Sequence, residues 1–217
     1  MKSVFSTAAI VLVLATAVPA MAETASTHAT KASVATSVAS RSASDVVKNF
    51  YAQLTGVMKQ GDQLGFAGRF KKLDPVLRQS FNLPLMTRFA VGLVWNDATP
   101  DEQQQITSAF SEFSTATYAS RFAKYDGEQF TVGEEKTAGG GKIVETTLKP
   151  KDGDAVALNY LLRQDEAGAW RIVDVFMNGT ISELATRRAE FSSVIKRDGI
   201  GALVNSLGEK SKQMGQT

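Results

Sequence analysis

Residues 156–177, VALNYLLRQDEAGAWRIVDVFM, decide the fold. Every second residue of the first part is large and apolar: Val156, Leu158, Tyr160 and Leu162. This period of two places one set of side chains on a single face of a β-strand. Residues 165–168 have the composition of a turn, and residues 170–177 follow as a second strand. The segment therefore predicts an antiparallel pair of strands with one apolar face.

The same alternation extends toward the N-terminus. Residues 130–132 and 142–149 are two further strand candidates, separated by three consecutive glycines at 139–141. Residues 150–154 have the composition of a turn and lead into the strand that begins at Val156. Short turns between about four consecutive strands predict an antiparallel meander.

Helical spacing of apolar residues surrounds these strands. The first helix is expected from Ser44 to a stop at Gly61. Proline in a first helical turn marks three further starts: Asp74 with Pro75, Leu83 with Pro84, and Thr99 with Pro100. Glu102 completes a capping box for the last of these, which is expected to run to Asp126 and Gly127. A helix from Ile181 to Gly199 and another beyond it complete an α+β fold with helices on one sheet face.

The N-terminus has the pattern of an export signal. Residues 8–18 form a short apolar run, followed at residues 20–22 by the small-x-small pattern of a cleavage site. We expect residues 1–22 to be a cleaved signal peptide and the protein to reach the periplasm. Residues 23–43 are rich in Ala, Ser and Thr, which predicts a flexible leader. Residues 44–214 fit a single domain.

Residue types on which many enzymes depend are scarce. The chain has no cysteine, and its one histidine, His28, lies in the predicted leader. Serine or thiol nucleophiles paired with histidine, and zinc sites, are therefore disfavoured. The glycines before Lys142 resemble a phosphate loop only superficially, because Lys136 and Ile143 stand where Gly and Ser or Thr are needed. We expect no metal and no cofactor.

The overall charge does not indicate a nucleic-acid partner. Lys and Arg together number 24 against 22 Asp and Glu, so no strong positive field would favour the phosphate backbone. Basic residues do cluster locally, at Lys71 and Lys72 and around Arg187, Arg188, Lys196 and Arg197. These clusters are compatible with lipid headgroups, with an acidic partner, or with an ordinary solvated helix face.

Asp174 keeps acid–base chemistry open. It is the one charged residue inside the strand segment IVDVF at 172–176. A carboxylate in that setting needs partners, because burying an unpaired charge is costly. One interpretation is a structural carboxylate bonded to an arginine or to backbone amides. The other is a catalytic group that works with Tyr160.

Taken together, the motifs of the second half resemble the MlaC (toluene-tolerance) family of periplasmic phospholipid-binding proteins. The resemblance rests on LNY at 158–160, Arg163, WRIVDV at 170–175, GTIS at 179–182, RAEFSSVI at 188–195, GIGAL at 199–203 and, earlier, ATPDEQ at 98–103. It covers about residues 44–214. FAGRF at 66–70, LDPV at 73–76 and FNLP at 81–84 are most similar to the HpnM branch, which is associated with hopanoid lipids.

This resemblance implies an NTF2-like α+β domain that holds lipid tails between its sheet and its helices. The implied ligand is a hopanoid or a phospholipid. The implied partners are membrane complexes of the MCE or RND type, and the expected state is a monomer. The family brings no catalytic residues to carry over. A lipid carrier also needs large apolar side chains around an enclosed space, since each buried methylene contributes about 0.8 kcal/mol.

Thirteen apolar residues on the predicted helices and strands are the candidates for lipid contact: Leu83, Leu85, Met86, Phe89, Ala90, Phe110, Phe113, Phe122, Leu158, Tyr160, Leu162, Val173 and Val175. Their pattern alone favours the interior of a packed core, and it does not distinguish a filled core from the wall of a cavity.

Three functions are compatible with these patterns. The first is a periplasmic lipid-transfer protein. The second is an enzyme on an NTF2-like scaffold that uses Asp174 and Tyr160 in a cavity. The third is a ligand-free adaptor of a transporter, which requires a closed core and one large exposed apolar patch.

Overall fold

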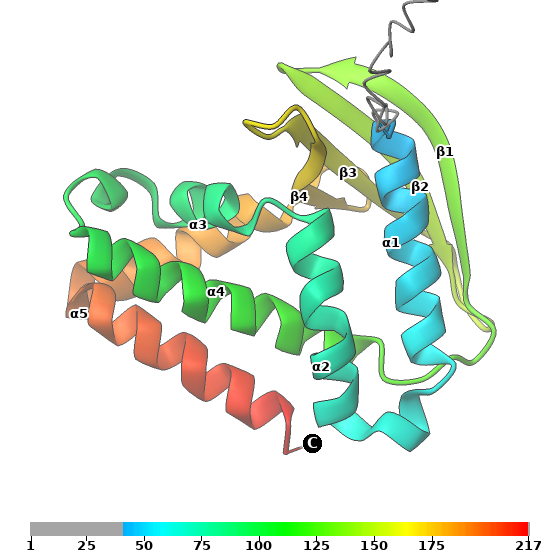
Figure 1. Ribbon diagram of the computed structural model, residues 1–217, viewed down its shortest axis with the longest axis horizontal. Helices are drawn as coiled ribbons and strands as arrows, with labels where there is room; N and C mark the ends of the chain where they lie inside the picture. Colours follow the sequence, from blue (N-terminus) through cyan, green and yellow to red (C-terminus); the bar gives the residue numbers. More distant parts are fainter. Residues whose placement is uncertain (1–40, 217) are drawn as a thin grey trace, which may run out of the picture. The chain divides into compact units, whose positions relative to one another are not determined.

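The computed structural model describes residues 41–216 (Figure 1). Its helices are α1 (Ala43–Met58), α2 (Gly61–Ser80), α3 (Leu83–Val91), the 3-10 helix η1 (Gly92–Asn96), α4 (Pro100–Arg121) and α5 (Glu183–Met214). Its strands are β1 (Gln129–Ala138), β2 (Gly141–Lys149), β3 (Val156–Gln164), β4 (Trp170–Met177) and β5 (Ile181–Ser182). The predicted signal peptide, and the predicted leader up to residue 40, lie outside the described residues. Within the described part of the chain, no helix has the length and apolarity needed to cross a membrane.

The strands form one antiparallel meander in the order β1-β2-β3-β4-β5. The predicted α+β fold is confirmed, with five strands rather than four because the short β5 also pairs with β4. Gly139 and Gly140 join β1 to β2 with φ of 51° and 77°, a left-handed geometry that glycine adopts at little cost and that suits a tight hairpin. β1 continues past the predicted 130–132 to Ala138. Its charged second half lacks the apolar alternation that marks the other strands.

An aromatic cluster joins the sheet to the helices that cover it. The ring of Phe50 on α1 packs edge-on against Phe81 at 5.2 Å, Tyr118 at 5.5 Å and Tyr160 at 6.3 Å between ring centroids. Edge-to-face pairs of this kind are worth about 0.5–1.5 kcal/mol each beyond the burial of their area. The cluster fixes α1, the end of α2 and α4 relative to β3.

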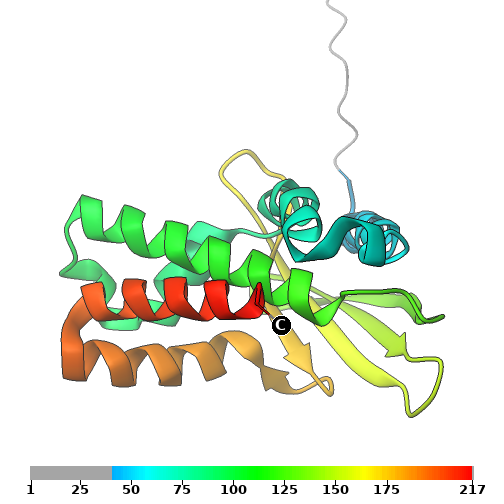
Figure 2. The ribbon, with the colours of Figure 1, turned by 90° about the horizontal axis from the view of Figure 1, so that it is seen from below.

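Two helix boundaries follow the predicted signals closely. At the start of α4 the Thr99 hydroxyl accepts from the Glu102 amide at 3.3 Å, and the Glu102 carboxylate accepts from the Thr99 amide at 2.8 Å, which is the predicted capping box. α5 breaks at Gly199, where φ is 82°. Its two arms therefore lie side by side and antiparallel, with α4 next to them (Figure 2). α4 itself ends at Arg121, earlier than predicted.

The helix start predicted at Asp74 and Pro75 was wrong. Both residues lie inside α2, which begins at Gly61 and is kinked at Gly65, where φ is 58°. Asp74 does not cap a helix. Its carboxylate instead accepts from the Arg78 guanidinium, one turn further along, at 2.9 and 3.0 Å. Good helix formers before the proline extend the helix backward, so the proline falls in its interior.

Asp174 is a structural joint between β4 and α5. Its carboxylate accepts from the Ser182 hydroxyl at 2.6 Å, the Val175 amide at 2.8 Å and the Leu184 amide at 3.1 Å. The Leu184 amide belongs to the first turn of α5, where helix amides lack internal partners and negative charge is favoured. These three donors are the partners that the sequence analysis required of a buried carboxylate.

We predict that Asp174→Ala lowers the free energy of unfolding by about 1–3 kcal/mol, because two amides and one hydroxyl would lose their acceptor at a partly buried site. Asp174→Asn should cost less, since its side-chain oxygen can still accept from the amides. Urea denaturation measures both. Asp152→Ala, in an exposed turn, is the control and should be neutral. Equal effects at the two positions would contradict the structural role.

Candidate functional site

A cavity of about 310 Å³ lies between the sheet and helices α3, α4 and α5. Its volume is at the lower end of the range of pockets that hold small organic ligands. The sheet contributes Leu148, Val156, Leu158, Tyr160, Val175 and Met177. Leu77 of α2, Phe81 between α2 and α3, and Leu83 and Met86 of α3 also line the cavity. The remaining lining comes from Phe110, Phe113, Ser114, Thr117, Tyr118, Arg121 and Phe122 around α4 and from Glu183, Leu184 and Arg187 on α5.

The sheet wall of the cavity follows from strand register. Tyr160 pairs with Val175 and Leu158 with Met177, so these four side chains share one face of two adjacent strands. Tyr160 is the most deeply placed polar group there, with 2% of its surface exposed. Burial raises the pKa of its phenol, and the neighbouring Tyr118 and Tyr51 raise it further. At neutral pH this wall is therefore uncharged.

A β-bulge removes one predicted residue from the wall. Leu161 pairs with Asp174 but Leu162 pairs with Ile172, which leaves Val173 as the extra residue. A bulge of one residue reverses which side chains face the helices beyond it. Ile172 consequently packs into the core beside Leu162, and Val173 does not.

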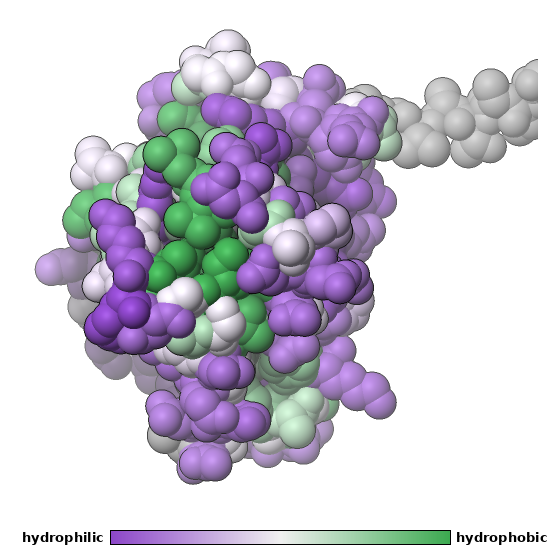
Figure 3. All heavy atoms as spheres, turned by 90° about the vertical axis from the view of Figure 1, so that its left-hand side faces the viewer, coloured by the Kyte–Doolittle hydropathy of each residue, from purple (hydrophilic) through white to green (hydrophobic). Residues whose placement is uncertain are grey.

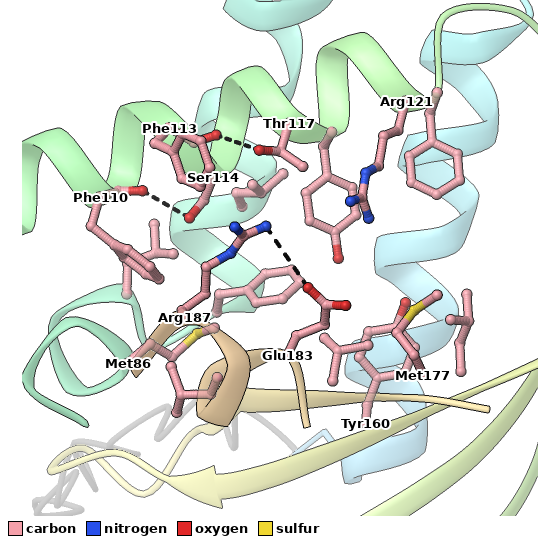
Figure 4. Close-up of a pocket in the computed structure, with 18 of the residues that line it drawn as sticks. Met86, Phe110, Phe113, Ser114, Thr117, Arg121, Tyr160, Met177, Glu183 and Arg187 are labelled. Atoms are coloured by element: carbon pink, nitrogen blue, oxygen red, sulfur yellow. Dashed lines mark hydrogen bonds and ion pairs between the residues drawn. The ribbon is translucent and has the colours of Figure 1, made fainter. Parts of the chain in front are cut away.

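The α4 wall is a stripe at helical spacing. Phe110, Phe113, Ser114, Thr117 and Arg121 fall on one side of the helix and face the cavity, as Figure 4 shows. The hydroxyls of Ser114 and Thr117 donate to the carbonyls of Phe110 and Phe113, both at 2.8 Å. Because these donors are satisfied within the helix, they do not compel a polar ligand in the middle of the cavity.

One end of the cavity is charged. Figure 4 shows Arg121 reaching from α4 toward the space that Glu183 and Arg187 approach from α5. Arg187 ion-pairs with Glu183 at 3.9 Å and with Glu190 at 2.9 Å, and its guanidinium lies 5.0 Å from the centre of the Phe113 ring. The cavity therefore has an apolar interior and a polar end, the arrangement that suits an amphiphile.

Eight of the thirteen predicted contact residues line this cavity: Leu83, Met86, Phe110, Phe113, Phe122, Leu158, Tyr160 and Val175. The other five lie elsewhere. Ala90, Leu162 and Val173 are buried away from the cavity, and Leu85 is half-buried outside its lining. Phe89 is 39% exposed, with the Arg163 guanidinium 6.0 Å from its ring. On α3 only one side of the helix reaches the cavity, so neighbours of Met86 in the sequence point away from it.

Sequence reasoning marked Arg187 at the polar end as compatible with lipid headgroups, but it missed Arg121, Glu183 and part of the apolar wall. Tyr118 could have been found, since it is one turn before Phe122 on the same helical stripe as Phe110. Arg121 and Glu183 gave no such signal. Charged residues near helix ends are common on protein surfaces, and only the spatial meeting of α4 and α5 gives these two a shared environment.

The pair that an enzyme would need is separated by the sheet. Tyr160 is in register with Val175, whereas Asp174 is in register with Leu161, so their side chains leave opposite faces. The Asp174 carboxylate also accepts hydrogen bonds from the Ser182 hydroxyl and the Leu184 amide in the joint between β4 and α5. Among residues 41–216, no group of three or more His, Cys, Asp or Glu side chains is placed to hold a metal ion.

An apolar patch lies at the far end of the helical layer. Figure 3 views the end formed by η1, the start of α4 and the bend of α5, and it shows apolar groups across the middle with hydrophilic ones around them. Leu93 of η1 is 79% exposed. The adaptor hypothesis requires such a patch, but it also requires a closed core, which the cavity contradicts.

Two comparisons agree with this geometry. The solved structure of a phospholipid-binding protein from Ralstonia solanacearum, in complex with a phospholipid, is 26% identical in sequence. It superposes with a TM-score of 0.69 over 79% of this chain and 98% of its own. No curated protein sequence matches the chain.

The sequence profile of the family described as MlaC protein matches residues 48–209, about three quarters of the 217 residues. That span includes every residue that lines the cavity. The chain belongs to the MlaC family.

Proposed function

We propose that this protein is a periplasmic carrier that binds the acyl chains of one phospholipid in the cavity and moves that lipid between membranes. The observation that carries the proposal is the cavity itself, with an apolar interior between sheet and helices and a charged end. The Ralstonia protein, which has the same fold, was solved with a phospholipid bound. A role in transport, rather than catalysis, is supported by the separation of Asp174 from Tyr160.

The physical basis of binding would be tail burial. Each methylene moved from water into the cavity contributes about 0.8 kcal/mol, so even part of an acyl chain offsets the entropy lost on association. Met86 of α3 and Met177 of β4 both line the cavity. Their unbranched side chains can rearrange, which would let the cavity adapt to tails of different length.

A phospholipid fits the charged end better than a hopanoid does. Guanidinium groups such as those of Arg121 and Arg187 bind phosphate oxygens by charge-assisted hydrogen bonds. A hopanoid without a phosphate would leave this charge unused. The similarity of residues 66–84 to the HpnM branch favours a hopanoid instead, and that ligand remains a prediction. Mass spectrometry of the bound lipid distinguishes the two.

Location and partners follow from the same role. The signal peptide predicted at residues 1–22 would export the chain to the periplasm, where a lipid cannot cross water unaided. Loading and unloading then require membrane proteins, and we propose complexes of the MCE or RND type as the donor and acceptor. The carrier would act as a monomer, since one chain encloses the cavity.

We predict that the protein, purified without detergent from cells whose membranes contain both phospholipids and hopanoids, carries one phospholipid. Native mass spectrometry would detect the complex, and fragmentation would identify the lipid. Detection of a bound hopanoid would instead support the ligand that the resemblance to the HpnM branch implies. Protein that stays free of any lipid after incubation with vesicles would contradict the carrier function.

We predict that Ser114→Trp lowers the amount of bound lipid at least about tenfold, because the indole would occupy space in the cavity. In lipid-free protein its effect on the free energy of unfolding should be small, since the ring enters an existing void. Bound lipid is quantified by mass spectrometry after extraction, and stability by urea denaturation of delipidated samples, because a bound ligand itself stabilises the fold.

Two tryptophan substitutions serve as controls for this variant. Ser108→Trp is exposed on the same helix and should change neither quantity. Ala90→Trp enters a fully buried position outside the cavity and should cost about 1–3 kcal/mol of stability by overpacking. If Ser114→Trp kept its lipid and lost stability like Ala90→Trp, the space would be ordinary core.

A further inference from the structure

The charged end of the cavity holds two carboxylates that differ in how firmly they are paired. Glu190 accepts from the Arg187 guanidinium at 2.9 Å and does not line the cavity. Glu183 lines the cavity and is 3.9 Å from the same guanidinium, at the outer limit of an ion pair. Arg187 is therefore held mainly by Glu190, and the Glu183 carboxylate remains available to a second cation.

Arg121 is in the complementary position. It stands in the last turn of α4 and lines the cavity, and its guanidinium has neither a hydrogen bond nor an ion pair to any residue in the described range 41–216. The charges of its guanidinium and of the Glu183 carboxylate both influence the pKa of the Tyr118 phenol. Burial is the main cause that raises the pKa of this phenol; Arg121 lowers the pKa and Glu183 raises it. One available cation and one available anion thus share the same end of the cavity.

We propose that this end is a headgroup site for a zwitterionic phospholipid with a primary amine, in which Arg121 binds the phosphate and Glu183 binds the ammonium. The proposal rests on the lipid-carrier function and names the headgroup class that the carrier prefers. Figure 4 shows the two side chains directed toward the same space from opposite walls. An ammonium group can donate hydrogen bonds to a carboxylate, which makes the contact directional as well as electrostatic.

The charges at this end of the cavity predict that a zwitterionic headgroup is preferred over an anionic one. Arg121 and Arg187 carry two positive charges at this end, and Glu183 and Glu190 carry two negative ones. A zwitterionic headgroup adds no net charge and satisfies both available groups. A headgroup with a phosphate but no amine would bind Arg121 and leave its negative charge near the loosely paired Glu183 carboxylate, a repulsion that acts as selection against it.

The test is a competition between two lipids. Delipidated protein is incubated with vesicles of phosphatidylethanolamine and phosphatidylglycerol in equal amounts and with matched acyl chains, separated, and analysed by quantitative mass spectrometry. We expect the wild type to hold at least about five times more phosphatidylethanolamine, the scale of one partly exposed charged hydrogen bond. Glu183→Gln should bring the ratio close to one while total bound lipid stays similar.

The matched control is Glu209→Gln, which removes an exposed carboxylate of the same helix that pairs with Lys212 outside the cavity lining and should leave the lipid ratio unchanged. Arg121→Gln should lower the binding of both lipids, because both have a phosphate, and should not reverse the ratio. Melting temperatures confirm that each variant is folded.

Three results would overturn the headgroup site: a wild-type ratio equal to that of the vesicles, an unchanged ratio in Glu183→Gln, or equal changes in Glu183→Gln and Glu209→Gln. In all three the protein still carries lipid, so the carrier function would stand. A wild type with no bound lipid would instead overturn the carrier function, and the headgroup site with it.

Discussion

The face shared by β3 and β4 meets α4 across a space that their side chains do not fill. Tyr160 and Val175 lie side by side on that face, and Phe110 and Phe113 face them from α4. Protein interiors are normally packed about as densely as organic crystals, so an apolar space of this size is a cost unless something occupies it. The aromatic cluster around Phe50 holds the sheet and helices apart at a fixed separation, and the remaining features of the site depend on that separation.

Much of the fold could be predicted because local signals and burial agree. The alternation at 156–162 marked a strand, the capping box at Thr99 marked the start of α4, and Gly199 marked the break in α5. Asp174 belongs here too, since a lone carboxylate in an apolar strand must have partners, and three donors surround it. Each of these features is decided by a few neighbouring residues.

The errors arose where distant contacts override local pattern. Val173 fits the alternation of β4, but the bulge opposite Leu161 and Leu162 places Ile172 in the core instead. Pro75 has the context of a helix start, yet the helix extends back to Gly61. The meeting of Arg121 with Glu183 at the polar end was hidden for the same reason, although the sequence does mark Arg187 as a basic residue compatible with lipid headgroups. Arg121 and Glu183 are far apart in the sequence, and no local pattern predicts that they meet.

The division of the cavity into an apolar interior and a charged end assigns different tasks to its two parts. Tail burial gives affinity without discrimination, because all acyl chains present the same methylenes. Discrimination must come from groups that are satisfied by one ligand and left unpaired by another. The free guanidinium of Arg121 and the loosely paired carboxylate of Glu183 meet that condition. Both lie at the rim, where water weakens ion pairs, so they can bias the choice of lipid without holding it too tightly to be released.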